Sequence, residues 1–377
     1  MSRESRVRRL TAALAICAAC GGLIGCRPAA PVGAAPLPAE TPPVERPAAP
    51  TLASAPPDTV PPPEDETPAA PPPAEERASD AFSGLRIDDL AAREYGGTGI
   101  VVGEATRYYP AFTRHRISYP SDGLTITGLV NIPRGEGPFP VIVLNHGYLT
   151  FDVYEPGADT WQMADWLAEH GYITLMPDYR NYGGSDRGPN PFHIGYAIDV
   201  LNLIAQVDSL PGAAPGQIGV IGHSMGGEIS MWPMVLSDEV DAVVLYASMS
   251  GDLALNYRYA LRSYPVQRGA MEALGLIYGT PDEHPEAFTE MSPASYFDRV
   301  RMPVLIHHGM LDDIVPYAWS VDLERSLHEA GADVTFYAYG DQGHAFRGRT
   351  FELFMGRNLA LLEAAVRADV NTPAADQ

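Results

Sequence analysis

The chain has 377 residues, including 36 prolines and 36 glycines, and a formal net charge of −22 at pH 7. Arginine supplies every one of its 25 strong cations, and these form no basic stripe, so we expect neither nucleic acid nor an anionic lipid surface as a partner. The absence of lysine excludes Schiff-base chemistry, a P-loop lysine and a lysine general base.

The N-terminal segment 1–26 has the pattern of an export signal. Arginines precede an apolar run that is too short to span a bilayer comfortably and that ends in Leu23, Ile24, Gly25 and Cys26. This end resembles a bacterial lipobox, in which the cysteine is lipidated and becomes the mature N-terminus. We expect an exported lipoprotein, periplasmic or cell-surface, whose membrane anchor is a lipid on Cys26. An ordinary cleaved signal is the alternative.

All three cysteines, Cys17, Cys20 and Cys26, lie in this signal segment, so the folded domain has no thiol after processing. Disulfides, zinc–thiolate sites and cysteine nucleophiles are therefore excluded from that domain. The sequence contains no HExxH motif and no carboxylate cluster with the spacing of metal ligands. We expect neither a metal nor a cofactor.

Residues 27–78 are so rich in proline and alanine that they cannot form part of a packed core. Such a composition favours extended, solvated conformers, so we interpret this stretch as a disordered linker. The folded domain is expected at 79–372.

The folded domain begins with alternating residues from about Thr113, where two runs separated by Ser-Asp-Gly predict a hairpin. Short apolar runs then alternate with helix-period segments, as expected for parallel strands that are buried on both faces. The runs are 141–145, 173–177, 218–222, 242–247, 304–308 and 334–339. The fold class is therefore α/β, with a mostly parallel central sheet flanked by helices.

Residues 249–300 interrupt this alternation, because about fifty residues separate the run at 242–247 from the next. An insertion of this length in a compact domain usually covers an active site or has another function. We interpret it as a small helical cap.

The motif Gly-His-Ser-Met-Gly places Ser224 directly after the run 218–222 and at the start of a predicted helix. This is the setting of a nucleophile elbow, in which a strained turn exposes the serine hydroxyl above the sheet edge. Gly222 and Gly226 leave the room that a close approach of strand and helix requires. We therefore predict that Ser224 is a nucleophile.

A serine hydroxyl needs a base within hydrogen-bonding reach and a third group that orients this base. Asp312 follows the run 304–308 and His344 follows the run 334–339, which gives the chain order serine, aspartate, histidine expected for this fold. Asp313 is the substitute for Asp312, and Asp341 is interpreted as a turn residue. The predicted triad is Ser224, Asp312 and His344.

A developing oxyanion needs two preorganised donors. We predict the backbone N–H of Met225, which follows the nucleophile, and that of Tyr148 in the loop after 141–145. The phenol of Tyr148 or of Tyr154 is a possible additional donor.

These motifs bring a family into view. The stretches PVIVLNHGY, PDYRNYGGSD, IGVIGHSMGG, HHGMLDDIVP and YGDQGHAF resemble the catalytic domain of prolyl oligopeptidase-like α/β hydrolases, and also dienelactone hydrolase-like proteins, over roughly 115–365. The resemblance implies an α/β-hydrolase fold and assigns the triad to the same three residues. Peptidases of this family usually carry a β-propeller, whereas here a short leader and a linker precede the domain, so an esterase is as good an expectation as a peptidase.

The remaining polar residues near strand ends receive structural interpretations. We expect four histidines to be packed or hydrogen-bonded side chains and not ligands: His146, His223, His307 and His308. Glu228, one helical turn after Ser224, is expected to be a solvated or capping carboxylate, with substrate contact as the alternative. Tyr257, Tyr259 and Tyr264 of the cap line a pocket or simply pack.

The sequence thus predicts a lipid-anchored serine hydrolase that acts on a small ester or a short peptide through an acyl-enzyme intermediate. An acyltransferase with the same triad is one alternative. A tethered binding protein without catalytic activity is the rival from another class.

Overall fold

Within residues 81–367, which the computed structural model describes, nine strands form one sheet in the order β1-β2-β3-β5-β4-β6-β7-β8-β9. The strands are β1 Val101–Tyr108, β2 Phe112–Ser121, β3 Leu124–Pro133, β4 Phe139–Asn145, β5 Ile173–Pro177, β6 Ala213–His223, β7 Ala242–Tyr246, β8 Val304–Gly309 and β9 Val334–Tyr339. The predicted signal 1–26, with Cys26, and the predicted linker 27–78 lie outside the described residues.

The sheet is antiparallel at its start and parallel afterwards. β1, β2 and β3 pair antiparallel, and β3 also pairs antiparallel with β5. Every pairing from β5 through β4, β6, β7 and β8 to β9 is parallel. The predicted α/β architecture with a mostly parallel sheet is therefore confirmed.

The hairpin between β2 and β3 turns at Asp122 and Gly123, whose φ angles are 50° and 79°. Ser121 pairs with Leu124, so the loop contains only these two residues. A two-residue hairpin loop of type I′ requires positive φ at both positions, which aspartate tolerates and glycine adopts without strain. The Ser-Asp-Gly signal therefore predicts the turn correctly.

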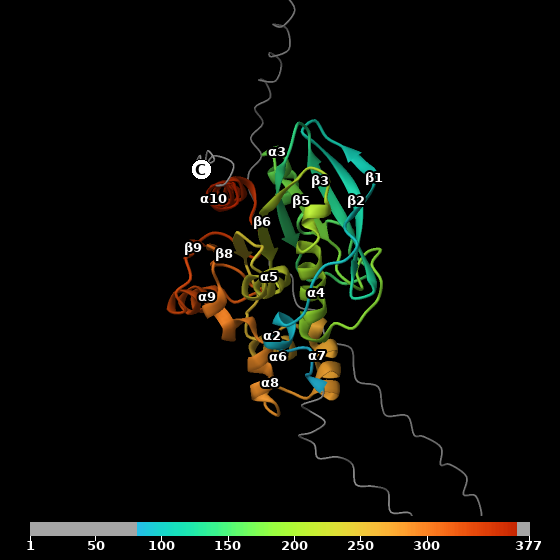
Figure 1. Ribbon diagram of the computed structural model, residues 1–377. Coiled ribbons are helices and arrows are strands. Elements are labelled where there is room, and N and C mark those ends of the chain that lie inside the picture. The colour runs from blue at the N-terminus through green and yellow to red at the C-terminus, as the bar shows by residue number, and fades with distance from the viewer. Residues whose placement is uncertain (1–80, 368–377) are drawn as a thin grey trace, which may run out of the picture. The chain divides into compact units, whose positions relative to one another are not determined.

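Helices cover both faces of the sheet. The helices outside the segment between β7 and β8 are α2 Ile87–Ala91, α3 Trp161–Glu169, η1 Pro191–His193, α4 Ile194–Ile204, η2 Val207–Ser209, α5 Met225–Leu236, α9 Tyr317–Glu329 and α10 Gly348–Ala365. α3 and α10 pack with each other on one face, whereas α4 and α5 pack together on the other, where α9 contacts β8 and β9. Figure 1 shows this arrangement.

The central strands bury both faces, as β4 illustrates. Val141 and Val143 belong to the core beneath α4 and α5, and Ile142 and Leu144 belong to the core beneath α3 and α10. Successive side chains of a strand point to opposite faces, so a strand covered on both sides must be apolar throughout. This is why the parallel strands could be predicted as continuous apolar runs.

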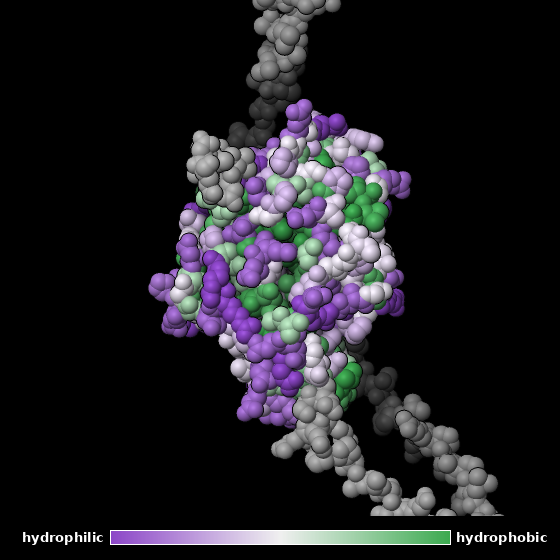
Figure 2. All heavy atoms as spheres, in the orientation of Figure 1, coloured by the Kyte–Doolittle hydropathy of each residue, from purple (hydrophilic) through white to green (hydrophobic). Residues whose placement is uncertain are grey.

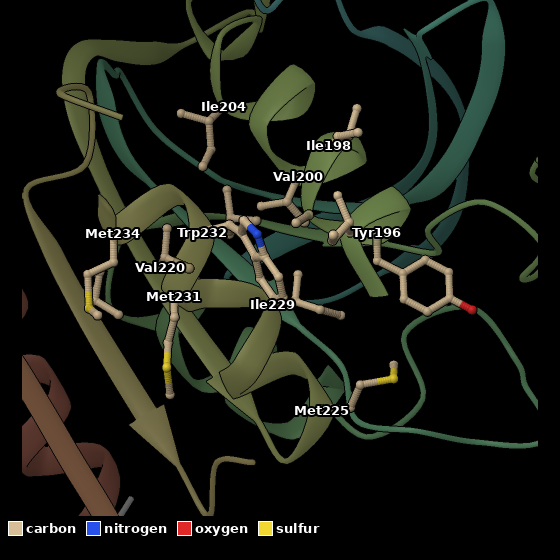
Figure 3. Close-up of a cluster of buried hydrophobic side chains, with 14 of the residues drawn as sticks. Tyr196, Ile198, Val200, Ile204, Val220, Met225, Ile229, Met231, Trp232 and Met234 are labelled. Atoms are coloured by element: carbon tan, nitrogen blue, oxygen red, sulfur yellow. The ribbon is translucent and has the colours of Figure 1, made fainter. Parts of the chain in front are cut away.

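The core on the α5 side is built around a fully buried tryptophan. Trp232 of α5 lies among Val200 and Ile204 of α4 and Val220 of β6 (Figure 3). Large aromatic side chains bury much apolar area and so contribute strongly to packing. This core holds α5, and therefore the residue at its start, against the sheet.

Two elements near the start of the described chain are absent from the sequence predictions. β1 is mostly exposed and its pairing with β2 is irregular between Val102 and Arg107. It therefore lacks the alternation that marks a half-buried strand. α2 has five residues, which is too short for a helical period to be recognised.

The segment predicted as a cap is helical. Between β7 and β8 the chain forms α6 Leu253–Ser263, α7 Pro265–Tyr278, α8 Pro285–Met291 and η3 Pro293–Arg299. α6, α7 and α8 lie together at one end of the domain, next to α2 (Figure 1). On the same view an apolar hollow surrounded by hydrophilic side chains opens over α5 (Figure 2).

Within 81–367, no helix combines the length and the apolar character needed to cross a bilayer.

β6 and α5 meet at a turn that depends on glycine. A Cβ atom on Gly226 would overlap the backbone oxygens of Asn145 and His146, and one on Gly222 would overlap the oxygen of Gly226. Backbone atoms cannot move aside as a flexible side chain can. The glycines therefore permit the contact between the start of α5 and the end of β4.

We predict that Gly226→Ala lowers the free energy of unfolding by more than about 2 kcal/mol, because overpacking against fixed backbone forces the helix away from the sheet. Equilibrium denaturation with urea measures this change. Gly356→Ala in α10 is the matched control, since a Cβ there meets nothing within 4 Å. The control should be neutral or slightly stabilising, because alanine has the higher helix propensity. Equal stability of the two variants would contradict the prediction.

Candidate active site

Ser224 sits at the turn between β6 and α5 in a strained conformation, with φ 57° and ψ −119°. Its N–H donates to the oxygen of Tyr246 at 2.9 Å, and its carbonyl accepts from the N–H groups of Gly227 and Met249, both at 3.0 Å. Positive φ is costly for a residue with a side chain and persists only where the surroundings enforce it. These hydrogen bonds fix the serine, which is 8% exposed.

Asp312 lies in the loop after β8, and both of its carboxylate oxygens are occupied. Oδ1 accepts from the N–H groups of Ile314 and Val315, each at 2.9 Å. Oδ2 accepts from His344 Nδ1 at 2.7 Å and from His308 Nε2 at 3.0 Å. Burial works to raise the pKa of Asp312, but the hydrogen bonds from the two histidines outweigh it and hold the pKa well below its usual range.

His344 lies in the loop after β9, and Asp312 fixes its orientation. Since Nδ1 donates to the carboxylate, Nε2 is the ring nitrogen left to accept a proton. Burial lowers the pKa of His344, and the nearby His223 lowers it further, while the Asp312 hydrogen bond acts in the opposite direction. The pKa of His344 is therefore below the ordinary value for a histidine.

The structure brings Ser224 and His344 to the same edge of the sheet. The carbonyl of His344 lies 3.0 Å from Nε2 of His223, the residue next to Ser224. Among residues 81–367, no hydrogen bond joins the Ser224 hydroxyl to the His344 ring. Catalytic hydrogen bonds are often long without substrate and shorten in the complex.

The alternative carboxylates do not take the place of Asp312. Asp313 and Asp341 are both exposed. Of the predicted pair, it is Asp312 whose side chain is fully buried against His344.

The loop after β4 passes directly beside the serine. A Cβ atom on Gly147 would lie 3.1 Å from the Cβ atom of Ser224. Within the described part of the chain, the N–H groups of Tyr148 and Met225 have no hydrogen-bond partner. Both predicted oxyanion donors are therefore unoccupied and stand on elements next to Ser224.

The phenol of Tyr154 cannot serve as a further donor to this site, so that expectation is wrong. Its hydroxyl donates to Asp178 Oδ1 at 2.7 Å, and the side chain is buried against His146. The ring of Tyr148 instead packs edge-on against Tyr264 of the cap, with 6.2 Å between the ring centres. The cap thus contacts the loop that carries the predicted oxyanion donor.

Glu228 is neither solvated nor a cap, contrary to the prediction. It is fully buried, and its Oε2 lies 3.0 Å from His193 Nδ1. Its Oε1 and the side-chain amide of Gln267 have no partner among the described residues. The sequence could not show this burial, because His193 comes from a distant segment that folds onto α5.

Glu228 and Gln267 line a small cavity between α5 and the cap, with a volume of about 10 Å³. Phe192, Met249 and Tyr257 contribute apolar walls. A site of this size accommodates one small hydrogen-bonding group. Because Glu228 follows Ser224 by one helical turn, the cavity lies one turn from the nucleophile. Its side formed by Glu228 and Gln267 is polar.

The cap tyrosines differ in role. Tyr257 lines the cavity, and Tyr264 contacts Tyr148. Tyr259 donates its hydroxyl to the carbonyl of Ile314, in the loop that carries Asp312. The cap is thus hydrogen-bonded to the loop that carries Asp312 and packed against the loop that carries Tyr148.

The four remaining histidines are packed or hydrogen-bonded, as expected, and two of them touch the site. His146 and His307 are buried, and His146 stacks on Tyr179. Burial lowers the pKa of His307 to about 3. His308 hydrogen-bonds to Asp312, and His223 contacts both Asp159 and His344. The positions of His223 and His308 beside the motifs are visible in the sequence, whereas no motif marks Asp159.

Residues 81–367 contain no group of three or more histidine, cysteine, aspartate or glutamate side chains that could hold a metal ion. Asp312 and His344 are hydrogen-bonded to each other in the loops after β8 and β9, and the His344 carbonyl contacts the residue next to Ser224. The fold and this arrangement define an α/β hydrolase.

Comparison with known proteins identifies the family. Residues 126–368 match the dienelactone hydrolase family, to which this chain therefore belongs. The peptidase YtmA of Bacillus subtilis, itself uncharacterized, is 24% identical over 246 residues, which are 64% of this chain and 91% of that protein. Dipeptidyl aminopeptidase BIII of Pseudoxanthomonas mexicana is 24% identical over 242 residues, and the match spans 60% of this chain but 34% of that enzyme.

Solved structures share the fold. Acetyl xylan esterase 1 from Thermoanaerobacterium superposes with a TM-score of 0.57 at 18% identity, over 76% of this chain and 94% of the esterase. An acylaminoacyl peptidase superposes with a TM-score of 0.52 at 20% identity, over 68% of this chain and 42% of the peptidase. The chain is thus a serine hydrolase whose relatives include esterases and peptidases.

Proposed function

We propose that this protein hydrolyses carboxylic esters through an acyl-enzyme intermediate, with Ser224 as nucleophile, His344 as general base and acid, and Asp312 as the group that orients the imidazole. The observation that carries the proposal is the 2.7 Å hydrogen bond between Asp312 and His344 Nδ1, next to a serine held at positive φ. The bond leaves His344 Nε2 as the proton acceptor.

In the first half-reaction, the Ser224 hydroxyl oxygen attacks the ester carbonyl while His344 Nε2 takes the hydroxyl proton. The N–H groups of Tyr148 and Met225 would bind the oxyanion, and both lack a partner among the described residues. His344 then gives its proton to the leaving alkoxide, and the acyl group stays on Ser224.

In the second half-reaction, water replaces the alcohol. His344 Nε2 takes a proton from water, the resulting hydroxide oxygen attacks the acyl carbon, and the Ser224 oxygen recovers a proton as it leaves. Asp312 remains ionised throughout, because its low pKa resists protonation. An added alcohol in place of water would make the enzyme an acyltransferase.

Ester substrates are favoured over peptides for two reasons. The family takes its name from the hydrolysis of a dienelactone, which is a cyclic ester. The cap lies close over the oxyanion loop through the contact of Tyr264 with Tyr148, which favours small substrates. Cleavage of short peptide amides is the second candidate, because the relatives YtmA and dipeptidyl aminopeptidase BIII are named as peptidases.

We predict that Ser224→Ala lowers kcat/KM for p-nitrophenyl acetate by about 10⁴-fold or more, since the acyl-enzyme can no longer form. Ser326→Ala, on the exposed side of α9, is the matched control and should leave turnover unchanged. Wild-type turnover by the Ser224 variant would disprove the proposed nucleophile. Parallel assays with alanine p-nitroanilide decide between ester and amide, and faster cleavage of the anilide would favour the peptidase.

The pH dependence follows from the base. His344 must be neutral to accept the serine proton, and its folded-state pKa is lowered from the ordinary value of about 6.5. Activity is lost as the pH falls through this lowered pKa, so we predict that the acid limb of kcat/KM has its midpoint below about pH 6.5. Circular dichroism over the same range controls for unfolding. A midpoint above pH 6.5 would contradict the prediction.

We also propose that the enzyme is an exported lipoprotein anchored through Cys26, on the basis of the residues Leu-Ile-Gly-Cys at the end of the apolar run. Acyl chains bind a bilayer because each buried methylene contributes about 0.8 kcal/mol. In a bacterial host that processes lipoproteins, Cys26→Ala should abolish incorporation of labelled palmitate and release the protein from the membrane fraction. Cys20→Ala is the matched control and should keep the label. Label retained by the Cys26 variant would refute the anchor.

A further inference from the structure

His223, the residue before the nucleophile, has an acceptor at each ring nitrogen. Nδ1 lies 2.9 Å from Oδ1 and 2.8 Å from Oδ2 of Asp159. Nε2 lies 3.0 Å from the carbonyl oxygen of His344. The side chain is 6% exposed, and its ring packs against those of Tyr246 and His344 at 4.4 Å and 4.7 Å between ring centres.

These contacts define the protonation state. A backbone carbonyl can only accept, so Nε2 must carry a hydrogen. Asp159 Oδ2 already accepts from the N–H of Gly147 at 2.7 Å, as an ionised carboxylate does. An ionised carboxylate requires a hydrogen on Nδ1 as well, which makes His223 an imidazolium.

The electrostatics of the two groups agree with this state. Burial lowers the pKa of His223, but the Asp159 carboxylate and the His344 carbonyl outweigh it and raise the pKa overall. Partial burial works to raise the pKa of Asp159, but the His223 charge and hydrogen bond hold it below its usual value. The titratable groups that face His223 are Asp159, Tyr246 and His344, with Asp312 beyond them.

The ion pair connects the two sides of the site. Asp159 precedes α3 and has a φ of 71°, a costly conformation for a residue other than glycine. Through Gly147 it holds the loop after β4, which carries Tyr148. Through His223 it holds the loop after β9, which carries His344. Asp159 and His223 thus form a hydrogen-bonded connection between the two loops.

We propose that His223 is a positioning residue that works as a permanent cation: its ion pair with Asp159 ties the His344 loop to the oxyanion loop, and its charge disfavours a second positive charge on His344. The inference rests on the proposed function, since it assigns His344 as the base. The imidazolium keeps His344 neutral, and therefore able to accept the serine proton, at a lower pH than an uncharged neighbour would.

Protonation can be read directly in the wild-type protein, without any variant. Nitrogen-15 NMR of the histidine side chains, between pH 5.5 and 8.5, should show one imidazole with both nitrogens protonated throughout, and His223→Gln should remove that signal. A singly protonated His223 at pH 7 would overturn the proposal. Because this readout is independent of turnover, it separates failure of this inference from failure of the proposed function.

The functional consequence is measured in the pH profile of kcat/KM. His223→Gln keeps a side-chain N–H that can reach the His344 carbonyl but removes the charge, so the midpoint of the acid limb should rise by about 0.5 to 1 pH unit. Asp159→Asn removes the carboxylate and, with it, the imidazolium. Loss of the His223 charge raises the pKa of His344 and loss of the Asp159 charge lowers it, so the midpoint should stay within about 0.3 unit of wild type. The kcat should fall about tenfold or more, because the two loops are no longer tied together.

The two variants distinguish charge from packing. If His223 served only to fill space, His223→Gln would lower activity without moving the acid limb, and that outcome would refute the proposal. A shift of the acid limb toward lower pH in His223→Gln would refute it as well. Circular dichroism of both variants across the same pH range excludes unfolding as the cause of any change.

Discussion

The close approach of α5 to the end of β4 constrains every group in the site. Gly226 lies against the carbonyl oxygens of Asn145 and His146, so the helix can begin only after a sharp turn, and Ser224 takes up that turn at positive φ. A conformation of this kind costs about 1–3 kcal/mol. The same approach places Gly147 beside Ser224, so the sheet itself sets the distance between the nucleophile and the oxyanion loop.

Two histidine–aspartate pairs stand next to each other in this site, and their surroundings give them different chemistry. His344 has one ring nitrogen bonded to Asp312 and the other unbonded among the described residues, so it can take and return a proton. His223 has both nitrogens bonded to acceptors and cannot do so. The number of hydrogen-bond acceptors around each imidazole therefore decides whether that histidine can exchange a proton.

The sequence allowed the sheet to be predicted because parallel strands covered on both faces are continuous apolar runs. The bounds 173–177 and 334–339 coincide with β5 and β9. The position of Ser224 followed from its motif, and those of Asp312 and His344 followed from the order in which such groups occur after strands. Motif and order need no knowledge of distant contacts.

The residues that escaped prediction depend on contacts between distant segments. Asp159 reaches His223 across 64 positions, and nothing near it in the sequence marks a partner. Glu228 is buried against His193, 35 positions earlier, and against the cap, both of which fold onto α5. A local pattern cannot show that a charged side chain will meet its counterpart, so such carboxylates look like ordinary surface residues.

The irregular outer strand β1 bears on how copies of this protein coexist at high concentration. Its free side carries no neighbour within the described sheet, and its register with β2 shifts twice between Val102 and Arg107. Bulges and charged side chains such as Glu104 and Arg107 interrupt the regular row of backbone groups that another strand would need for docking. Within residues 81–367, the irregularity and the charges of β1 itself therefore protect this border of the domain against edge-to-edge aggregation.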